Sequence, residues 1–456
     1  MNILFCISQI DYADHIALAY LSAVAKQRGH STFLCILAHD DLSSRVMETQ
    51  ADVVAYATNI QGFDEMVAAH KRARAQRNFV SIMGGPHVTF NPDTFAEAGV
   101  DAYCIGEGEY AFRDFLDRVA AGQSYDDVPN LITRAGRNPV RALIADLDEI
   151  PFPDRDLTLA NTYLANTEKK TFYATRGCPF GCAYCCNDIY NAMYRGKGKI
   201  LRRFGVDRIL SEIEYVKARY RTEFVKFGDD LFAMHADDWL AEFAEAYPRR
   251  IGLPFNCYLR FDTVDEELLR LLKQAGCWSV HLSVDSASKH VRDDVLKRRM
   301  RNVDIVERLR MIHDAGINTW VNFMLAAPDS SLEDDLASID IGRRGRVTYV
   351  SYSTTVPMRG TSLYDYADSR GLIDRDHHTS DMNGCMERSS LTCFSEKDKD
   401  IRYNIYLLGA IAAALPKPLA APVMGAIRHL PPNRLFRAIR QKYYRHNIEH
   451  RIFKLS

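Results

Sequence analysis

The first part of the chain alternates short apolar, β-branched runs with longer stretches of helical period. The predicted strands are Ile3–Ser8, Thr32–Ile36, Val53–Thr58, Phe79–Gly84 and Ala102–Ile105. Between the first two strands, apolar residues recur at helical spacing over Ile16–Gln27, and Gly29 follows as a C-cap. This alternation predicts βαβ units around a parallel sheet, in a doubly wound α/β domain over residues 1–125. Its ligand loops should lie at the carboxyl ends of the strands.

A second series of strand and helix patterns follows a proline-rich stretch, which we interpret as a linker over residues 126–170 with a possible hairpin around Leu131–Leu143. The series predicts six βα units over residues 171–370, fewer than a closed βα barrel contains. The predicted strands are Phe172–Thr175, Phe224–Phe227, Asn256–Leu259, Ser279–Val284, Asn318–Leu325 and Val347–Thr354.

The remaining residues, 371–456, lose this rhythm and predict a small, mainly helical C-terminal region. Its apolar segment Ile405–Leu415 ends at Pro416 and is too short for a membrane-spanning helix, which needs ~20 apolar residues. Further on, Leu435, Phe436, Ile439 and Tyr443 share one helical face among many basic residues. Such a helix can lie on a membrane surface, although packing on its own domain is the interpretation we favour. Either segment would suit a cap over a substrate cavity.

Composition narrows the class of protein. The chain has 456 residues and a formal net charge of −1, which gives no electrostatic footprint for DNA or RNA. No secretory signal precedes the first predicted strand, so we expect a cytoplasmic location where disulfides are unlikely. The chain contains 11 cysteines, and most of those outside the stretch TRGCPFGCAYCCND should be ordinary buried thiols.

That stretch places Cys178, Cys182 and Cys185 in the loop after a predicted strand, with the spacing Cys-x-x-x-Cys-x-x-Cys. A structural zinc site usually takes four protein ligands in two pairs, and no second pair is visible. Three thiolates suit a [4Fe–4S] cluster in which one iron stays open for another ligand. We interpret the adjacent Cys186 as a neighbouring buried thiol rather than a ligand.

Two glycine-rich loops follow strands of the first domain. Met83-Gly84-Gly85-Pro86-His87 follows the fourth strand, and Gly106-Glu107-Gly108-Glu109 follows the fifth. Glycine at such positions lets the backbone approach a flat or phosphate-bearing ligand closely. Taken alone, each loop is a weak signal, because a glycine pair after a strand is more often just a tight turn.

The cysteine stretch resembles the radical S-adenosylmethionine (SAM) superfamily, and YATRGCPFGCAYCCN resembles its cobalamin-dependent branch. The resemblance implies a partial (β/α)6 TIM-like barrel, with Cys178, Cys182 and Cys185 holding a [4Fe–4S] cluster whose open iron chelates SAM. Tyr184 would lie against the adenine. An electron from a donor such as flavodoxin or ferredoxin would then cleave SAM to a 5′-deoxyadenosyl radical.

The N-terminal domain resembles the Rossmann-like cobalamin-binding domain of the same enzymes through GGPHVTFNP, DAYCIGEGEYAF and LAYLSAVAKQRGH. The implied loops are Gln9–His15, Thr58–Gln61 and Gly84–Thr89. The pattern Asp-x-His-x-x-Gly, which supplies an axial histidine elsewhere, is absent, so His15, beside Asp11 and Asp14, is read as a loop histidine. A domain that binds no cobalamin stays possible. The implied cobalamin contacts are Thr58, Asn59, Gly84, Gly85, Pro86, His87, Gly106 and Glu107.

The resemblance also places SAM contacts at barrel strand ends. Asp229 and Asp230 follow the second strand, where relatives bind the SAM amino group, and the resemblance implies that one of them makes this contact. The same residues suit an N-cap of the following helix. Asp285 and Ser286 follow the fourth strand, where relatives usually carry Glu-Ser-Gly. Arg260 and Asn322 can face the cavity, with a structural hydrogen bond as the equally good alternative.

These features predict an enzyme that methylates an unactivated carbon, using the radical and methylcobalamin. Cyclisation or ring rearrangement without methyl transfer is the alternative within the family. A non-catalytic metal- or corrinoid-binding sensor is the alternative from another class. The substrate should be a small molecule, and the apolar C-terminal region hints that it is hydrophobic.

Overall fold

The structure is a computed structural model that describes residues 1–10, 13–59, 61–300, 302–374, 385–386 and 388–455. The chain divides into two compact units. The first comprises Met1–Thr167, Ile189–Arg202 and Tyr215–Arg221, and the second comprises Glu168–Asp188, Arg203–Glu214 and Thr222–Ser456. The domain boundaries at 125, 170 and 370 stay predictions, because this division follows contacts rather than sequence order.

The first unit contains a seven-stranded sheet in the order β2-β1-β3-β4-β5-β6-β7. The first five strands are parallel, and β5, β6 and β7 pair antiparallel. This confirms the predicted doubly wound α/β domain and the short hairpin after it. The strands are β1 (Asn2–Ile7), β2 (Ser31–Ile36), β3 (Val53–Ala57), β4 (Val80–Gly84), β5 (Ala102–Cys104), β6 (Leu131–Thr133) and β7 (Gly136–Arg137).

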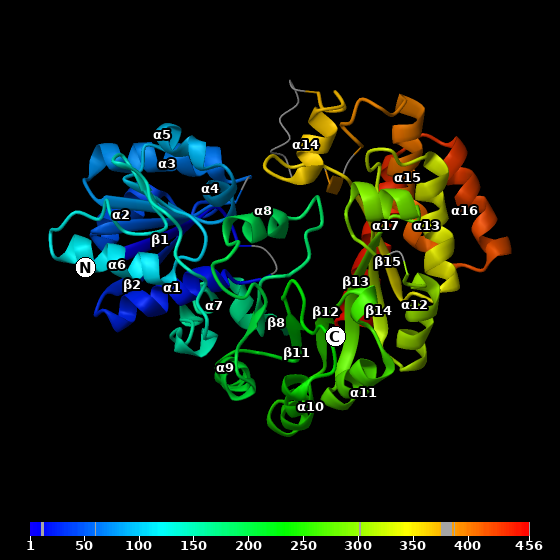
Figure 1. The fold of residues 1–456 in the computed structure, drawn as a ribbon, viewed down its shortest axis with the longest axis horizontal. Coiled ribbons are helices and arrows are strands. Elements are labelled where there is room, and N and C mark those ends of the chain that lie inside the picture. Colours follow the sequence, from blue (N-terminus) through cyan, green and yellow to red (C-terminus); the bar gives the residue numbers. More distant parts are fainter. Residues whose placement is uncertain (11–12, 60, 301, 375–384, 387, 456) are drawn as a thin grey trace. The chain divides into compact units, whose positions relative to one another are not determined.

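Helices cover both faces of this sheet, which explains why β1 reads as an unbroken apolar run. Leu4 and Cys6 point into the core beneath α2 and α3, whereas Ile3, Phe5 and Ile7 point into the core beneath α1 and α6. Figure 1 shows the helices on either side of the strands. The helices are α1 (Ile16–Gln27), α2 (Leu42–Thr49), α3 (Phe63–Gln76), α4 (Pro86–Phe90), α5 (Phe95–Ala98), α6 (Glu109–Ala120) and α7 (Asp156–Leu159).

The second unit contains a six-stranded, all-parallel sheet in the order β15-β14-β13-β12-β11-β8. The order confirms the six predicted βα units of a partial barrel. Two short strands, β9 (Thr175–Arg176) and β10 (Arg202–Arg203), lie outside this sheet. The six strands are β8 (Lys169–Phe172), β11 (Phe224–Phe227), β12 (Phe255–Tyr258), β13 (Cys277–Asp285), β14 (Asn318–Leu325) and β15 (Tyr349–Thr354).

The first barrel strand is a correction to the sequence prediction. The predicted strand Phe172–Thr175 is two elements, because β8 ends at Phe172 and β9 begins at Thr175. Residues Lys169 to Phe172 pair with β11 instead. Two consecutive lysines concealed the start of this strand, since a lysine pattern predicts solvent exposure, yet Lys170 is buried.

Helices connect the barrel strands and continue into a C-terminal helical region, as predicted (Figure 1). The helix α15 packs against β15 and α13, and α16 packs against α15. The helices are α8 (Cys186–Met193), α9 (Val206–Arg219), α10 (Asp238–Arg250), α11 (Glu266–Ala275), α12 (Ile305–Asp314), α13 (Leu332–Arg344), α14 (Ser362–Asp368), α15 (Glu396–Ala414), α16 (Lys417–His429) and α17 (Arg434–His446).

The last residues of the described chain lie at the amino ends of the barrel strands. After α17, the π-helical turn η7 (Asn447–Ile452) accepts a hydrogen bond from Ser279 Oγ at the Ile452 carbonyl, 2.7 Å away. Trp278 Nε1 donates to the Arg451 carbonyl at 2.9 Å. Trp278 and Ser279 both lie at the start of β13. This terminal segment therefore lies at the amino ends of the strands, so it does not form the cap over a substrate cavity that the sequence suggested.

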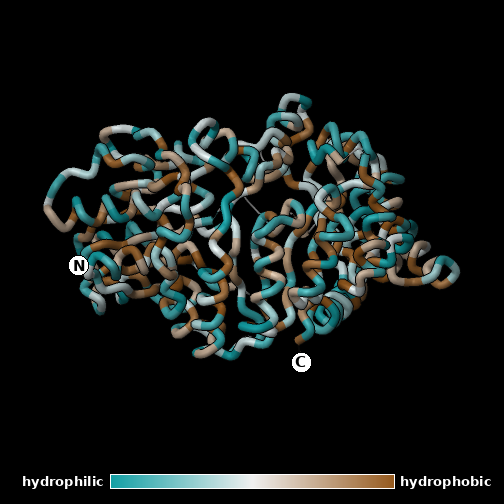
Figure 2. The backbone as a smooth tube through the Cα atoms, turned by 60° about the horizontal axis from the view of Figure 1, so that its bottom comes forward, coloured by the Kyte–Doolittle hydropathy of each residue, from teal (hydrophilic) through white to brown (hydrophobic). Residues whose placement is uncertain are grey.

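Apolar and polar residues are interleaved along the backbone (Figure 2), and none of the described helices is long and apolar enough to cross a membrane.

Candidate functional site

The cysteine loop begins directly after β9 and ends where α8 begins at Cys186. Cys182 is buried, Cys178, Cys185 and Cys186 are half-buried, and none of the four is in a disulfide. Backbone hydrogen bonds fix the loop, since Ala183 N donates to the Leu296 carbonyl at 3.0 Å and Leu363 N donates to the Ala183 carbonyl at 2.8 Å. The described residues contain no group of three or more His, Cys, Asp or Glu side chains arranged to hold one metal ion.

Two arginines direct guanidinium groups at the sulfur of Cys182. Arg260 Nη1 lies 3.7 Å and Arg298 Nη1 lies 3.5 Å from Cys182 Sγ. Arg260 is also stacked over Phe180, with its Cζ 3.6 Å from the ring centroid. Cationic donors stabilise a thiolate over a thiol. The environment of Cys182 therefore fits an anionic sulfur ligand.

The sulfur of Cys185 is also an acceptor. The backbone and side-chain nitrogens of Asn187 lie 3.5 and 3.6 Å from Cys185 Sγ. Hydrogen bonding from the Cys186 thiol, more than from Asn187, lowers the pKa of Cys185 to about 7. The same hydrogen bond raises the pKa of Cys186, which keeps its proton. Burial raises the pKa of Cys178 to about 11.

The two aspartates after β11 take different positions. Asp229 is 2% exposed, and its Oδ1 accepts hydrogen bonds from Thr175 N at 2.5 Å and Thr175 Oγ1 at 2.9 Å. Its other oxygen, Oδ2, is buried and has no hydrogen-bond partner among the described residues. Burial raises the pKa of Asp229 to about 7. Asp229 thus anchors the strand from which the cysteine loop starts.

Asp230 reaches solvent and lies on the side of the cysteine loop. Its charge contributes to the raised pKa of Cys178, after burial, and Asn187 hydrogen-bonds to its carboxylate. Partial desolvation raises the pKa of Asp230 itself. A carboxylate that is accessible beside the cysteine loop fits a cationic ligand group such as the SAM ammonium.

Tyr184 and Asp285, both predicted to contact SAM, are hydrogen-bonded to each other. The Tyr184 hydroxyl donates to Asp285 Oδ2 at 2.6 Å, and Arg298 Nε lies 2.8 Å from the same oxygen. Ser283 Oγ donates to Asp285 Oδ1. The neighbouring Ser286 is buried, and its Oγ accepts from Ser288 N at 3.2 Å. These side chains are engaged within the protein, and of Tyr184, Asp285 and Ser286 only Tyr184 is half-buried rather than buried.

Arg298 is the residue that the sequence analysis missed. It joins Asp285 to Cys182, and its Nη2 donates to the Ser283 carbonyl at 2.7 Å. The basic run around it, LKRRMR, is typical of a solvated surface segment, yet the Arg298 side chain is buried, with 8% of the residue exposed. Of the other candidates, Asn322 Nδ2 lies 3.5 Å from Ser353 Oγ, and Ser351 Oγ donates to Asn322 Oδ1 at 3.1 Å. Asn322 therefore makes the structural hydrogen bonds that its strand position allowed.

In the first unit, the loops after β3 and β4 meet at the carboxyl edge of the sheet. Thr58 N donates to the Gly84 carbonyl at 3.0 Å, and His87 N donates to the Thr58 carbonyl at 3.3 Å. Gly85 has a φ of 106°, and a Cβ there would lie 2.6 Å from the Thr58 carbonyl oxygen. Only glycine fits this close approach.

His87 places unsatisfied polar atoms at this edge of the sheet. The side chain is buried, with its ring stacked on Phe63 at a centroid distance of 3.9 Å. Both ring nitrogens are buried without a hydrogen-bond partner among the described residues. Burial lowers the pKa of His87, so the ring is neutral near pH 7. Because buried polar atoms are nearly always satisfied, the edge fits a polar cofactor that would supply the partner.

The remaining N-terminal candidates are engaged within the protein. Asn59 Oδ1 accepts from Gly62 N at 2.9 Å. Both carboxylate oxygens of Glu107 pair with Arg202, at 2.8 and 3.1 Å, and one also accepts from Ile144 N. A Cβ on Gly106 would collide with the Tyr194 hydroxyl.

In the loop after β1, a ring nitrogen of His15 lies 3.3 Å from the Gln9 carbonyl oxygen, in the manner of a loop histidine. Asp14 forms a buried ion pair with Arg155, with Nε and Oδ2 3.0 Å apart. Asp11 lies outside the described residues, as does residue 60 of the predicted loop Thr58–Gln61.

Comparison with known proteins adds two family models. The B12 binding domain model matches residues 11–116, and the radical SAM superfamily model matches residues 172–339. The two matches follow the same order along the chain as the two sheets, and the second contains the cysteine loop.

Three relatives match most of the chain at low identity. The chain is 26% identical over 372 residues to an uncharacterised methyltransferase of Pyrococcus horikoshii, covering 78% of this chain and 79% of the relative. It is 24% identical over 387 residues to the hopanoid C-3 methylase of Methylococcus capsulatus, covering 81% and 71%. It is 22% identical over 339 residues to the anaerobic magnesium-protoporphyrin IX monomethyl ester cyclase of Rubrivivax gelatinosus, covering 69% and 59%.

Two solved structures share the fold. The radical SAM methyltransferase TsrM from Kitasatospora setae, with tryptophan and a SAM analogue bound, has a TM-score of 0.65 at 17% identity, covering 82% of this chain and 77% of that one. The cobalamin-dependent radical enzyme OxsB, with aqua-cobalamin and SAM bound, has a TM-score of 0.71 at 14% identity, covering 98% and 75%.

The two family models and the shared fold agree with the cysteine loop and the glycine-rich sheet edge. The chain carries a B12 binding domain followed by a radical SAM domain and shares the fold of cobalamin-dependent radical SAM enzymes, and the cofactors that these domains imply are a [4Fe–4S] cluster, SAM and cobalamin.

Proposed function

We propose that this enzyme methylates an unactivated carbon of a small-molecule substrate. The observation that carries the proposal is the cysteine loop, in which cationic donors surround Cys182 at the carboxyl end of a partial barrel. When bound, the cluster and SAM supply a 5′-deoxyadenosyl radical, and cobalamin supplies the methyl group. The relatives named as methylases support this outcome.

The proposed cluster ligands are Cys178, Cys182 and Cys185. Arg260, Arg298 and Asn187 hold donors on two of these sulfurs and thereby stabilise the thiolate form that a cluster needs. Cys186 keeps its proton and donates to Cys185, so it tunes a ligand instead of being one.

The proposed SAM contacts follow from accessibility. Asp230 would receive the SAM ammonium beside the cysteine loop, and Asp229 would position that loop through Thr175. Tyr184 would offer its ring to the adenine while its hydroxyl stays bonded to Asp285. Asp285 and Ser286 would then orient this wall of the site, with the carboxylate of Asp285 held by Arg298.

The proposed cobalamin seat is the edge formed by Thr58, Asn59 and the loop Gly84–Gly85–Pro86–His87. Gly85 lets the loop after β4 approach Thr58 closely, and His87 offers a ring nitrogen to a polar group of the ligand. Gly106 and Glu107 would shape the seat from the side through Tyr194 and Arg202.

Cyclisation without methyl transfer is the second candidate, because a magnesium-protoporphyrin cyclase is among the relatives. Either reaction needs a low-potential electron donor such as flavodoxin or ferredoxin, and we propose a small, hydrophobic substrate and a cytoplasmic location. A metal- or corrinoid-binding sensor without turnover finds no support in the radical SAM match or in the relatives, which are named as enzymes.

Replacing the ligand cysteines tests the cluster. Cys178→Ala, Cys182→Ala and Cys185→Ala should each lower the iron content and abolish formation of 5′-deoxyadenosine, because each removes one of three ligands. Cys186→Ala should retain most of both, and Cys393→Ala, at an exposed thiol, is the matched control. Iron analysis and chromatography of the nucleoside products provide the readouts. Full activity in any of the first three variants would refute the ligand assignment.

Substitutions of Asp229 and Asp230 should change different measured quantities, the iron content and the KM for SAM. Asp230→Asn should raise the KM for SAM by about tenfold with unchanged iron content, because one charge-assisted hydrogen bond is worth ~1.4 kcal/mol. Asp229→Ala should instead lower the iron content, because Thr175 loses both hydrogen bonds that set the start of the loop. The opposite pattern, with SAM affinity following Asp229 and iron content following Asp230, would exchange the two roles.

Isotope labelling separates methylation from cyclisation without knowledge of the substrate. Enzyme loaded with cobalamin and reduced strongly should convert SAM carrying a deuterated methyl group to S-adenosylhomocysteine, with the label recovered on cobalamin. Enzyme without cobalamin is the control and should form no S-adenosylhomocysteine. If the loaded enzyme makes 5′-deoxyadenosine and methionine alone, the methyl-transfer proposal fails and the cyclase reading takes its place.

A further inference from the structure

Charge is distributed unevenly along this chain. Residues 401–456 contain ten lysines and arginines but a single acidic residue, Glu449, whereas the whole chain has 58 basic and 59 acidic residues. The residues before 401 therefore carry a net negative charge. This segment forms most of α15 and all of α16, α17 and η7.

The same segment concentrates exposed apolar side chains. The large hydrophobic residues that are most exposed in the structure include four from α16, α17 and the turn between them: Leu419 at 63%, Leu430 at 52%, Leu435 at 65% and Ile439 at 38%. Single exposed leucines are ordinary, but several within one basic hairpin indicate an interaction surface.

The helix α17 is divided along its length into an inner and an outer side. Phe436 is buried, and Tyr443 packs with the cluster around Tyr349 and η7. Leu435 and Ile439 are one helical turn apart and exposed. The apolar stripe that the sequence predicted as one face is therefore split, since one edge packs on the barrel and the other faces solvent.

Basic side chains flank the exposed edge. Arg434, Lys442 and Arg445 are exposed and form no ion pair within the part of the chain that the structure describes. Arg437 is also exposed, with its Cζ 5.7 Å from the ring centroid of Tyr403. The nearby Arg428, in contrast, is paired with Glu333 at 3.2 Å.

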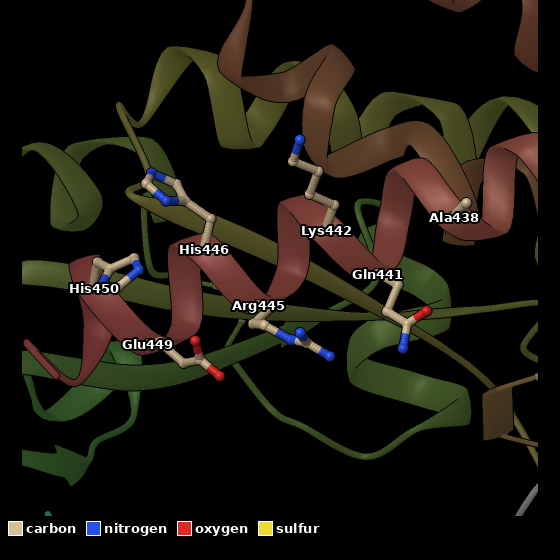
Figure 3. Close-up of a pocket in the computed structure, with 7 residues that line it drawn as sticks. All are labelled: Ala438, Gln441, Lys442, Arg445, His446, Glu449 and His450. Carbon is tan, nitrogen blue, oxygen red and sulfur yellow. The ribbon is translucent and has the colours of Figure 1, made fainter. Parts of the chain in front are cut away.

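An open hollow of about 350 Å³ runs along the end of α17 and the start of η7, and Figure 3 shows its side chains projecting from that one helical run. Glu449 is the one carboxylate among its lining residues. The lining residues are Ala438, Gln441, Lys442, Arg445, His446, Glu449 and His450.

From these observations we propose that α16 and α17 dock the enzyme on an anionic lipid surface. The docking surface comprises Leu419, Leu430, Arg434, Leu435, Arg437, Ile439, Lys442 and Arg445. Apolar side chains inserted at the lipid boundary and cations facing anionic headgroups are the two contributions that hold an amphipathic helix on a membrane. The cationic hollow would receive a headgroup phosphate.

The exposed leucines favour a lipid surface over a nucleic acid, because contacts with phosphate groups use cations and gain little from aliphatic side chains. The basic excess favours anionic lipid over a neutral bilayer. The helices are too short to span the membrane, so the surface would hold the enzyme at the interface. This proposal concerns α16 and α17 alone and stands independently of the reaction.

Flotation of the complete enzyme with lipid vesicles tests the proposal. The enzyme should float with vesicles of phosphatidylcholine containing about one-third phosphatidylglycerol at low salt, and much less with pure phosphatidylcholine. The bound fraction should fall several-fold at high salt, because counterions screen the basic side chains.

Two variants and two controls locate the contact. Leu435→Ser with Ile439→Ser, and Arg434→Glu with Lys442→Glu and Arg445→Glu, should each reduce flotation at least tenfold. Met47→Ser, at an exposed apolar residue elsewhere, and Lys71→Glu with Arg72→Glu should leave flotation unchanged. Circular dichroism verifies that each variant is folded.

Three results would overturn the proposal. They are no flotation with the anionic vesicles, equal flotation with both lipid compositions, and equal loss in the Lys71/Arg72 control.

Discussion

The buried carboxylate of Asp285 is the interaction on which the arrangement of the radical SAM site depends. It accepts hydrogen bonds from Tyr184 and Ser283, pairs with Arg298 and is fully buried. Tyr184 belongs to the cysteine loop, Asp285 ends β13, and Arg298 lies in the segment that follows. A charge buried this deeply is costly unless every partner is present, so the three segments must assemble together.

Arg298 extends this interaction to the sulfur of Cys182. The same guanidinium contacts Asp285 through Nε and Cys182 through Nη1, so the position of a proposed cluster ligand is set by a barrel strand distant in sequence. Asp229 positions the start of the loop by accepting a hydrogen bond from Thr175 N. The loop is thus held at both ends by carboxylates that follow parallel strands, which places its sulfurs at the carboxyl edge of the sheet.

Much of the fold followed from periodicity alone. The helix Ile16–Gln27 and the strand Asn318–Leu325 match the predicted bounds, because local hydrophobic spacing records which faces are buried. The strand that begins at Lys169 does not match its predicted bounds, because its lysines are placed by tertiary packing that a local sequence pattern does not report. The prediction of a single apolar face on α17 was incomplete for a related reason. Spacing predicts an apolar stripe, but it does not predict how much of that stripe a neighbouring element covers.

The site was predictable in its ligand types and less so in its contacts. The cysteine spacing and the glycine pair are the signals by which the sequence predicts the candidate loops, because few residue types can do that chemistry. The division of work between Asp229 and Asp230, the engagement of Glu107 with Arg202 and the role of Arg298 depend on partners far away in the sequence. The orphaned nitrogens of His87 likewise became visible only once its surroundings were known.

The central claim is that three cysteines of one loop leave an iron open for SAM. Electron–nuclear double resonance of the reduced cluster, with SAM carrying ¹⁵N in its amino group, tests this claim directly. The account predicts a ¹⁵N coupling that appears when SAM is added and is absent from the enzyme without SAM. A spectrum that SAM does not alter would contradict it, because the cluster would then have no iron open to SAM.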